Sequence, residues 1–406
     1  MSGTERSFGV EAHPIAADRF SRLGALISFV APFSVVVAHA GTASIWRDDL
    51  TLLRGLAWIG GGRSGCVSAL LAQVSFFLPI GSLHFRLALV AAIVLGAAGG
   101  AIHALVRDLL RRGEMQVPLL ASAVATIAAL AATLSAAAQR EGGTLGGGGV
   151  ALLLALLALW MRPGEALAEP RRAIALGSLV GALAAESPGT AFAVIAALAT
   201  ARFFEEPPSR TQGAPWALGA AIVTAVLLMS PAWVRPFAKD SFFEGARVLT
   251  ALAAPPLTGL GGGISERIAV EGAVAVSVAV LGLLYGLRAR VLRSGAVAFA
   301  IVLLCDLLAT IGEAKWWPRA DVAPLHFLAS AVIAAGTAIA VYALATTLLA
   351  WRLAMAKGAA ILLVMTDLTL AVAAAEEASF SSDLHAWRGA EALTDELWDD
   401  LPPNAV

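Results

Sequence analysis

Long apolar segments recur along almost the whole chain, and this recurrence decides what the chain can fold into. A helix needs about 20 apolar residues to cross the hydrocarbon of a bilayer. The segments that qualify, or nearly qualify, are 23–41, 87–106, 116–138, 148–161, 173–185, 189–203, 215–232, 268–287, 294–312, 326–350 and 358–375. Only 14% of the 406 residues are charged, whereas about a quarter are charged in a typical soluble domain. A soluble core could not cover so much apolar surface, so we predict an all-α, polytopic transmembrane helix bundle with about eleven spans.

Two stretches do not fit a simple series of spans. The stretch 173–203 contains the sequence Glu186-Ser187-Pro188-Gly189, and a proline interrupts a helix. We therefore expect either two short helices or one broken helix there. The apolar stretch 67–80 reads as a helix that lies in or dips into the membrane interface without crossing it.

The placement of Lys and Arg orients the spans. If the N-terminal segment, residues 1–22, is cytoplasmic, the short loops on the same side are basic, as the positive-inside rule requires. Their basic residues are Arg107, Arg111, Arg112, Arg162, Arg171, Arg172, Arg202, Arg210, Arg288, Arg290, Arg293, Arg352 and Lys357. The longer external segments are the loops 42–86, 233–267 and 313–325 and the acidic tail 376–406. We predict a multi-pass protein of a bacterial inner (plasma) membrane, with a transmembrane domain over residues 23–375 and an extracytoplasmic C-terminus.

The external loops hold the first candidate site residues. Asp48 and Asp49 are adjacent carboxylates just beyond the first apolar segment. They could bind a divalent cation, one of them could act as a general base, or both could belong to a solvated loop. Trp316 and Trp317, in the third external loop, are either interfacial anchors or surfaces on which a sugar or an isoprenoid chain stacks.

Three acidic residues fall within or at the ends of apolar segments: Glu186, Asp306 and Asp367. Ionisable residues inside a membrane are functional candidates by default. These three could form a relay or an ion path, or each could be a protonated or hydrogen-bonded acid with a structural role.

Several classes of function find no support in the sequence. A net charge of −1 gives no basic field for nucleic acid. No Cys/His cluster has the spacing of a zinc site, and no Walker, Rossmann or Ser-His-Asp pattern is present. Cys66 and Cys305 are expected at different depths in the membrane, so we expect no disulfide between them.

One part of the chain resembles a known family of multi-pass membrane proteins. The sequence FFLPIGSLHFRLALVAAIVLGAAGGAIHALVRDLL, residues 76–110, matches the family's L-P-I-G-S run and the arginine that leads the next span. Upstream, Trp46-Arg47-Asp48 falls where the family has W-G-D. The final sequence GAEALTDELWDDLPPNAV is similar to a segment that follows the family's last span. On these motifs the chain resembles the domain of unknown function 2723 family, which is related to the protein O-mannosyltransferases of the GT-C class.

The resemblance implies a GT-C-like fold and a function. In that class an acidic residue of the first external loop acts as the base or helps to bind metal at the membrane face, which points to Asp48, with Asp49 beside it. The donor would be a sugar on a polyprenyl phosphate, and the acceptor an extracytoplasmic protein or glycan. Arg86, Arg235 and Arg247 could hold the lipid phosphate.

The chain also departs from the family pattern. Residues 61–66, Gly-Gly-Arg-Ser-Gly-Cys, replace an H-P-P-G-Y-P-like run, and Thr51 replaces an acidic residue. A His-containing stretch of the family becomes Ala185-Glu186-Ser187-Pro188. We therefore expect either a changed substrate or lost catalysis, and a chain truncated after Val406 or lacking an extramembrane domain.

Two other functions stay open at this stage. The chain could be a non-catalytic membrane scaffold or partner subunit that kept the fold. It could also be a transporter that uses Asp306 and Asp367.

Overall fold

The computed structural model describes ten segments of the chain, and all regular structure within them is helical. The segments are 14–39, 65–112, 117–135, 138–139, 144–161, 163–205, 213–228, 272–316, 323–351 and 354–382. The helices are α1 (Pro14–His39), α3 (Cys66–Phe76), α4 (Leu83–Leu110), α5 (Pro118–Thr133), α7 (Gly149–Trp160), α8 (Pro163–Ala168), α9 (Pro170–Glu186), α10 (Pro188–Arg202), α11 (Ala214–Leu228), α14 (Ala273–Arg288), α15 (Arg293–Trp316), α16 (Ala323–Ala350) and α17 (Ala354–Ser382). The predicted all-α helix bundle is confirmed.

Each of the eleven apolar segments coincides with one of these helices. Three helical stretches in the described residues are long and apolar enough to cross a membrane: Arg19–His39, Phe85–Leu110 and Pro324–Ala350. The chain is therefore a membrane protein, while the number of crossings and the orientation stay predictions. Helix α17 continues past residue 376, where the external tail was expected to begin.

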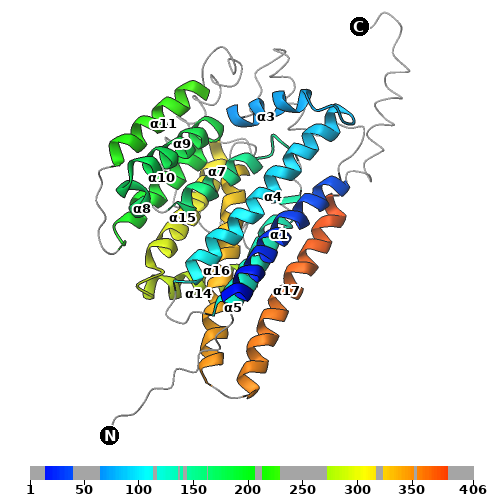
Figure 1. Cartoon of the computed structure of the whole chain (residues 1–406), viewed down its shortest axis with the longest axis vertical. Coiled ribbons are helices and arrows are strands. Elements are labelled where there is room, and N and C mark those ends of the chain that lie inside the picture. The colour runs from blue at the N-terminus through cyan, green and yellow to red at the C-terminus, as the bar shows by residue number, and fades with distance from the viewer. Residues whose placement is uncertain are drawn as a thin grey trace, which may run out of the picture.

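The interrupted stretch 173–203 forms two helices. Ser187 separates α9 from α10, and Pro188 occupies the first position of α10, where a missing backbone N–H costs no hydrogen bond. The two helices contact each other and lie side by side (Figure 1). Of the two predicted alternatives, two short helices or one broken helix, the structure has two helices.

Helix α4 lies at the centre of the bundle, where it contacts α1, α5 and α7. Glycines permit several of the closest helix contacts. A Cβ atom at Gly99 of α4 would collide with the carbonyl oxygen of Ser28 in α1. In the same way, a Cβ at Gly177 of α9 would collide with the carbonyl oxygen of Ala217 in α11, and one at Gly282 of α14 with that of Gly336 in α16. Small residues of this kind let the backbones of membrane helices approach each other.

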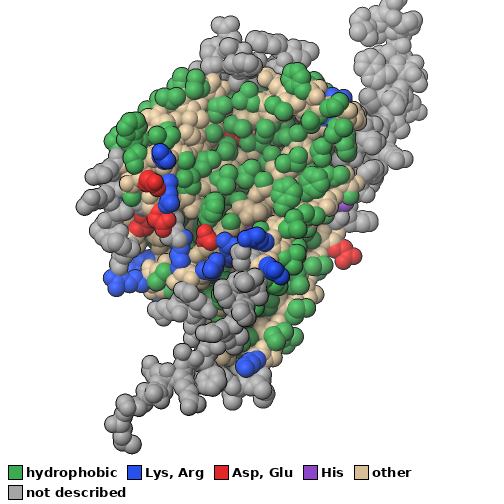
Figure 2. All heavy atoms as spheres, viewed as in Figure 1, with side chains coloured by type: hydrophobic (Ala, Val, Ile, Leu, Met, Phe, Trp, Pro, Cys, Tyr) green, Lys and Arg blue, Asp and Glu red, His purple; other side chains and the backbone are tan. Residues whose placement is uncertain are grey.

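The outer surface is largely apolar. Helix α11 has no buried residue, and it exposes Trp216, Leu218, Ile222, Val226 and Leu227. Figure 2 shows hydrophobic side chains over most of the face in view, with Lys and Arg gathered toward its lower part. A helix that is hydrophobic all round, on the outside of a bundle, is suited to contact with lipid.

Two ends of the bundle are used below. The basic end is the one where α4 ends and α15 begins, with Arg107, Arg111, Arg112 and Arg293. The α3 end is the opposite one, where α4 begins and α9 ends, and α3 lies across it (Figure 1). By the positive-inside rule, the basic end is the predicted cytoplasmic end and the α3 end is the predicted external one.

Candidate functional site

The predicted catalytic loop connects the end of α1 with the start of α3, so the described part of the candidate site begins with α3. The carboxylate of Glu186, at the end of α9, lies at the N-terminus of this helix. Its Oε2 atom accepts hydrogen bonds from the backbone N–H groups of Val67 (2.8 Å) and Ser68 (3.0 Å). Its Oε1 atom accepts a hydrogen bond from the hydroxyl of Ser68.

The first N–H groups of a helix have no partner within the helix, and the helix dipole makes that end attractive to a negative charge. The carboxylate of Glu186 accepts hydrogen bonds from these N–H groups and lies where the dipole favours a negative charge. Glu186 was an intramembrane functional candidate, and the structure gives it a structural role: it fixes α3 to the end of α9.

The start of α3 is tightly packed around this carboxylate. A Cβ atom at Gly65 would collide with the carboxylate of Glu186, so a larger residue there would displace this carboxylate. Cys66 is fully buried, and its burial, with a smaller effect of the Glu186 charge, raises the pKa of the thiol to about 12. The Cys66 thiol therefore stays protonated near neutral pH and is a packing group. Cys305 is also free and belongs to a different buried cluster.

The turn between α3 and α4 contains the L-P-I-G-S sequence that carries the family resemblance. Gly81 has a φ of 54°, a left-handed conformation that glycine adopts without strain. Arg86 reaches back into this turn from the first part of α4. Its Nε donates to the carbonyl oxygen of Ile80 (2.8 Å), and its two terminal nitrogens donate to those of Phe76 (3.2 Å) and Gly81 (3.1 Å). Arg86 thus holds the turn, while its predicted contact with a lipid phosphate stays a prediction.

The stretch 67–80 forms the short helix α3 and the turn after it, and its place at the membrane interface stays a prediction. The eleven residues of α3 are too few to cross a bilayer. One side packs on the bundle, whereas Val74, Phe76, Phe77 and Ile80 are exposed, with Phe77 86% accessible. Apolar side chains exposed beside a helix end of this kind are suited to insertion among lipid headgroups and the adjoining acyl chains.

A second polar pair lies between α15 and α16. The carboxylate of Asp306 is almost fully buried, and its Oδ1 atom is 2.5 Å from Nδ1 of His326. The surrounding cluster of Ala193, Cys305 and Leu325 is apolar or weakly polar. Asp306 is therefore a hydrogen-bonded acid, which is the structural alternative considered for it.

His326 was not a sequence candidate. It stands at the beginning of the apolar segment 326–350, and an ionisable residue at that place is the signal that could have identified it. Asp367 lies elsewhere, on α17, which packs against α16 and α5.

The remaining predicted site residues are not among the side chains that the structure describes. The residues Asp48, Asp49, Arg235, Arg247 and Trp317 lie outside the described segments. Trp316 is the last residue of α15, and its side chain is also outside the description. Within the described ranges, no group of three His, Cys, Asp or Glu side chains could hold a metal ion.

Comparisons with known proteins show a likeness to solved structures. No model of a protein family matches the chain, and no curated protein matches it. A crystal structure of an oligosaccharyltransferase from Archaeoglobus fulgidus, tethered to an acceptor peptide with an NVT sequon, is similar over 91% of this chain with a TM-score of 0.48 and 15% identity. The chain covers 55% of that protein, about half its length. Membership in the domain of unknown function 2723 family stays a prediction.

Proposed function

We propose that this protein is a membrane glycosyltransferase of the GT-C type, which transfers a sugar from a polyprenyl-phosphate donor to an extracytoplasmic protein or glycan. The observation that carries the proposal is the sequence match of residues 76–110, because this segment folds into a fixed corner. Arg86 holds the L-P-I-G-S turn through three backbone carbonyls, and Glu186 holds the preceding helix α3. Such a corner is a rigid support for the loop that carries the expected catalytic carboxylate.

In the proposed reaction, the acceptor hydroxyl attacks the anomeric carbon of the donor sugar. Asp48 takes the proton of that hydroxyl, the bond between the sugar and the lipid phosphate breaks, and the phosphate leaves on its lipid. Asp49 lies beside the base and supports it or a divalent cation. Arg235 and Arg247 hold the phosphate, and Trp316 and Trp317 line the sugar or prenyl chain. The exposed apolar side chains of α3 keep this site at the membrane interface, where a lipid-linked donor and a water-soluble acceptor can meet.

The test is sugar transfer in membranes that contain the full chain. A polyprenyl-phosphate sugar with a radiolabelled sugar is supplied. The radioactivity that is transferred to extracytoplasmic proteins or glycans is then measured. Asp48→Asn keeps the size of the side chain but removes the base, so transfer should fall by about 100-fold or more. Asp367→Asn is the matched control, because it makes the same change on α17, and it should leave transfer unchanged.

Other outcomes identify the other functions. If Asp48→Asn transfers sugar as well as the unaltered chain, the assignment of the base is wrong. If the unaltered chain shows no transfer and a deletion strain keeps its surface glycans, the protein is a scaffold or partner subunit. A proton-coupled flux that Asp306→Asn and Asp367→Asn both abolish would identify a transporter.

A further inference from the structure

The exposed aromatic side chains of the described segments lie toward the two ends of the bundle. Those at the basic end are Phe20, Trp160, Phe203, Phe204, Trp216, Tyr285 and Trp351. Phe76 and Phe77 belong to the α3 end, and Phe192 lies in the second turn of α10, which begins at that end. In the same segments, the exposed large apolar side chains between the two ends are aliphatic, as on α1, where Leu26 and Val30 are exposed.

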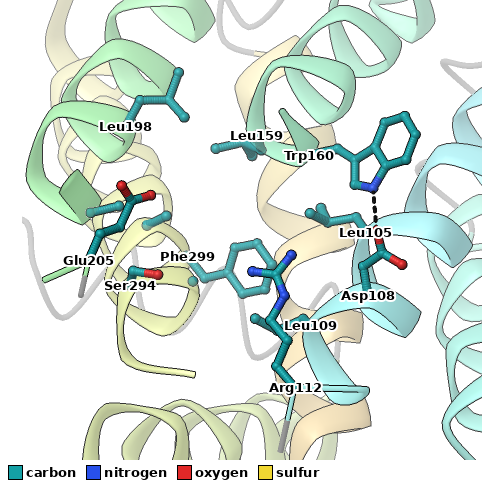
Figure 3. Close-up of a pocket in the computed structure, with 13 residues that line it drawn as sticks. Leu105, Asp108, Leu109, Arg112, Leu159, Trp160, Leu198, Glu205, Ser294 and Phe299 are labelled. Carbon is teal, nitrogen blue, oxygen red and sulfur yellow. Dashed lines mark hydrogen bonds between the residues drawn. The ribbon is translucent and has the colours of Figure 1, made fainter. Parts of the chain in front are cut away.

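Contacts with the last turn of α4 place two of the basic-end aromatic side chains at the same level. Phe20 is next to Ser21 of α1, whose hydroxyl oxygen accepts a hydrogen bond from the guanidinium of Arg107. The indole N–H of Trp160, at the end of α7, donates to the carboxylate of Asp108 (3.0 Å), as Figure 3 shows. The exposed aromatic side chains of α1 and α7 therefore lie beside neighbouring residues of α4.

A small pocket brings three more aromatic side chains to this level. The ends of α4, α7 and α10 and the start of α15 meet around it, and its lining includes Asp108, Arg112, Trp160, Glu205 and Gly295 (Figure 3). Phe203 and Phe204 directly precede Glu205, so they lie at the level of the pocket. Tyr285 lies near it as well, because a Cβ atom at the adjacent Gly286 would collide with the first turn of α15.

The distance between the two groups of aromatic side chains matches the thickness of a membrane. The basic-end band consists of Phe20, Trp160, Phe203, Phe204 and Tyr285, and the α3 band of Phe76 and Phe77. Arg86 donates to the carbonyl oxygen of Phe76 (3.2 Å), so the α3 band lies at the level of Arg86, as the basic-end band lies at that of Arg107. Along α4 these two arginines are about 32 Å apart, at about 1.5 Å per residue. The hydrocarbon core of a bilayer is about 30 Å thick.

We propose that the two bands bind the headgroup layers of a phospholipid bilayer, the basic-end band in the cytoplasmic leaflet and the α3 band in the external leaflet. Aromatic side chains, above all those of Trp and Tyr, combine an apolar ring with a polar edge and collect at both membrane interfaces. The aliphatic surface between the bands then contacts the acyl chains. This inference does not depend on sugar transfer, and it gives the α3 corner the depth of the lipid headgroups.

Spacing and charge favour a lipid over a protein partner for the basic-end band. A protein partner would not require a second band at the thickness of the hydrocarbon on the opposite end. Exposed cations also accompany the basic-end band, among them Arg22, Arg111 and Arg288. Basic residues beside an aromatic band are suited to the anionic phosphates of the cytoplasmic leaflet.

The test measures the depth of spin labels on the full chain. Cys66 and Cys305 are buried, so a label reacts with one added, exposed cysteine. Single cysteines replace Phe20, Phe203 and Phe77 in the bands and Val30 between them. Each protein is reconstituted in vesicles of phosphatidylethanolamine and phosphatidylglycerol. Collisions of the label with oxygen, which concentrates in the hydrocarbon, and with a water-soluble nickel chelate give its depth.

We expect the labels at Phe20, Phe203 and Phe77 to lie at headgroup depth. Val30→Cys is the matched control for Phe20→Cys, because both positions are on α1 and both native side chains are 43% exposed. Its label should lie at least about 10 Å deeper, since the two positions are about 15 Å apart along the helix.

Three results would overturn the proposal. Equal depths for the labels at Phe20 and Val30 would show that the basic-end band does not mark the membrane boundary. Free collision of the labels at Phe20 and Phe203 with the nickel chelate, as in bulk water, would place this band outside the bilayer. Protection of these two labels from both oxygen and the chelate would show that a protein partner, and not lipid, covers the band.

Discussion

The two ends of the bundle differ in how their ionisable side chains are hydrogen-bonded. At the α3 end, Glu186 accepts three hydrogen bonds from the start of α3, and Arg86 donates three to the turn that follows. At the basic end, the Nε atoms of Arg107 and Arg112 are buried and make no hydrogen bond within the part of the chain that the structure describes. The hydrogen-bonding groups of Glu186 and Arg86 are thus satisfied by the fold, whereas the described residues leave a donor of each of these two arginines without an acceptor.

This difference suggests a division of roles within one membrane domain. Groups that are fully hydrogen-bonded to backbone atoms fix the position of a segment, since each bond constrains both partners. Substitutions should therefore lower the free energy of unfolding more at the α3 end than at Arg112 of the basic end.

The largest effect on stability should come from Glu186. Replacement by alanine leaves the N-terminus of α3 without its carboxylate and opens a space next to Gly65. We expect the free energy of unfolding to fall by about 3 kcal/mol, because three N–H and O–H donors at the start of α3 would lose their acceptor. Thermal unfolding in detergent measures the loss, and limited proteolysis should cut the chain near α3.

Glu169→Ala provides the control for this substitution. Glu169 pairs with Arg172 at 2.9 Å, but both side chains are more than half exposed. Its loss should cost less than about 0.5 kcal/mol, as is usual for surface ion pairs. If Glu186→Ala is as mild as the control, the carboxylate does not hold α3, and the contrast between the two ends disappears.

The buried pair of Asp306 and His326 should give the next effect. Asp306→Ala leaves the imidazole without its partner in an apolar environment, and we expect a loss of about 2 kcal/mol. A variant with leucine at both positions should lose less, because replacing a buried polar pair by apolar groups is often nearly neutral. Unfolding of Asp306→Leu, His326→Leu and the variant with both substitutions measures the coupling. Additive losses would show that the two side chains do not interact.

The comparison also separates what the sequence could predict from what it could not. Apolar segment length was enough to predict eleven of the thirteen helices in the described residues, and Pro188 was enough to predict the break before α10. The partner of Glu186 was not predictable, since Ser68 is 118 positions away in the chain and the contact depends on how α3 and α9 meet. The same holds for Arg112, because its pocket is formed by four helix ends that come together only in the fold. Asp48 and Asp49 rest on the resemblance alone, and their place stays a prediction.

Arg86 should show a smaller effect that distinguishes two roles. Lysine keeps the charge but cannot reach three carbonyls at once, so Arg86→Lys should lose about 1 kcal/mol of unfolding free energy. If Arg86 serves the turn alone, the KM for the polyprenyl-phosphate donor stays unchanged in the folded variant. A raised KM with unchanged stability would assign Arg86 to the phosphate and remove it from the structural group at the α3 end.

Arg112→Gln should have the smallest effect on stability. Within the described residues the side chain makes no hydrogen bond through Nε, so the free energy of unfolding in detergent should change by less than about 0.5 kcal/mol. Thermal unfolding beside Glu186→Ala measures the difference. A loss as large as that of Glu186→Ala would show that Arg112 contributes to the fold as much as Glu186 does, and the contrast between the two ends would not hold.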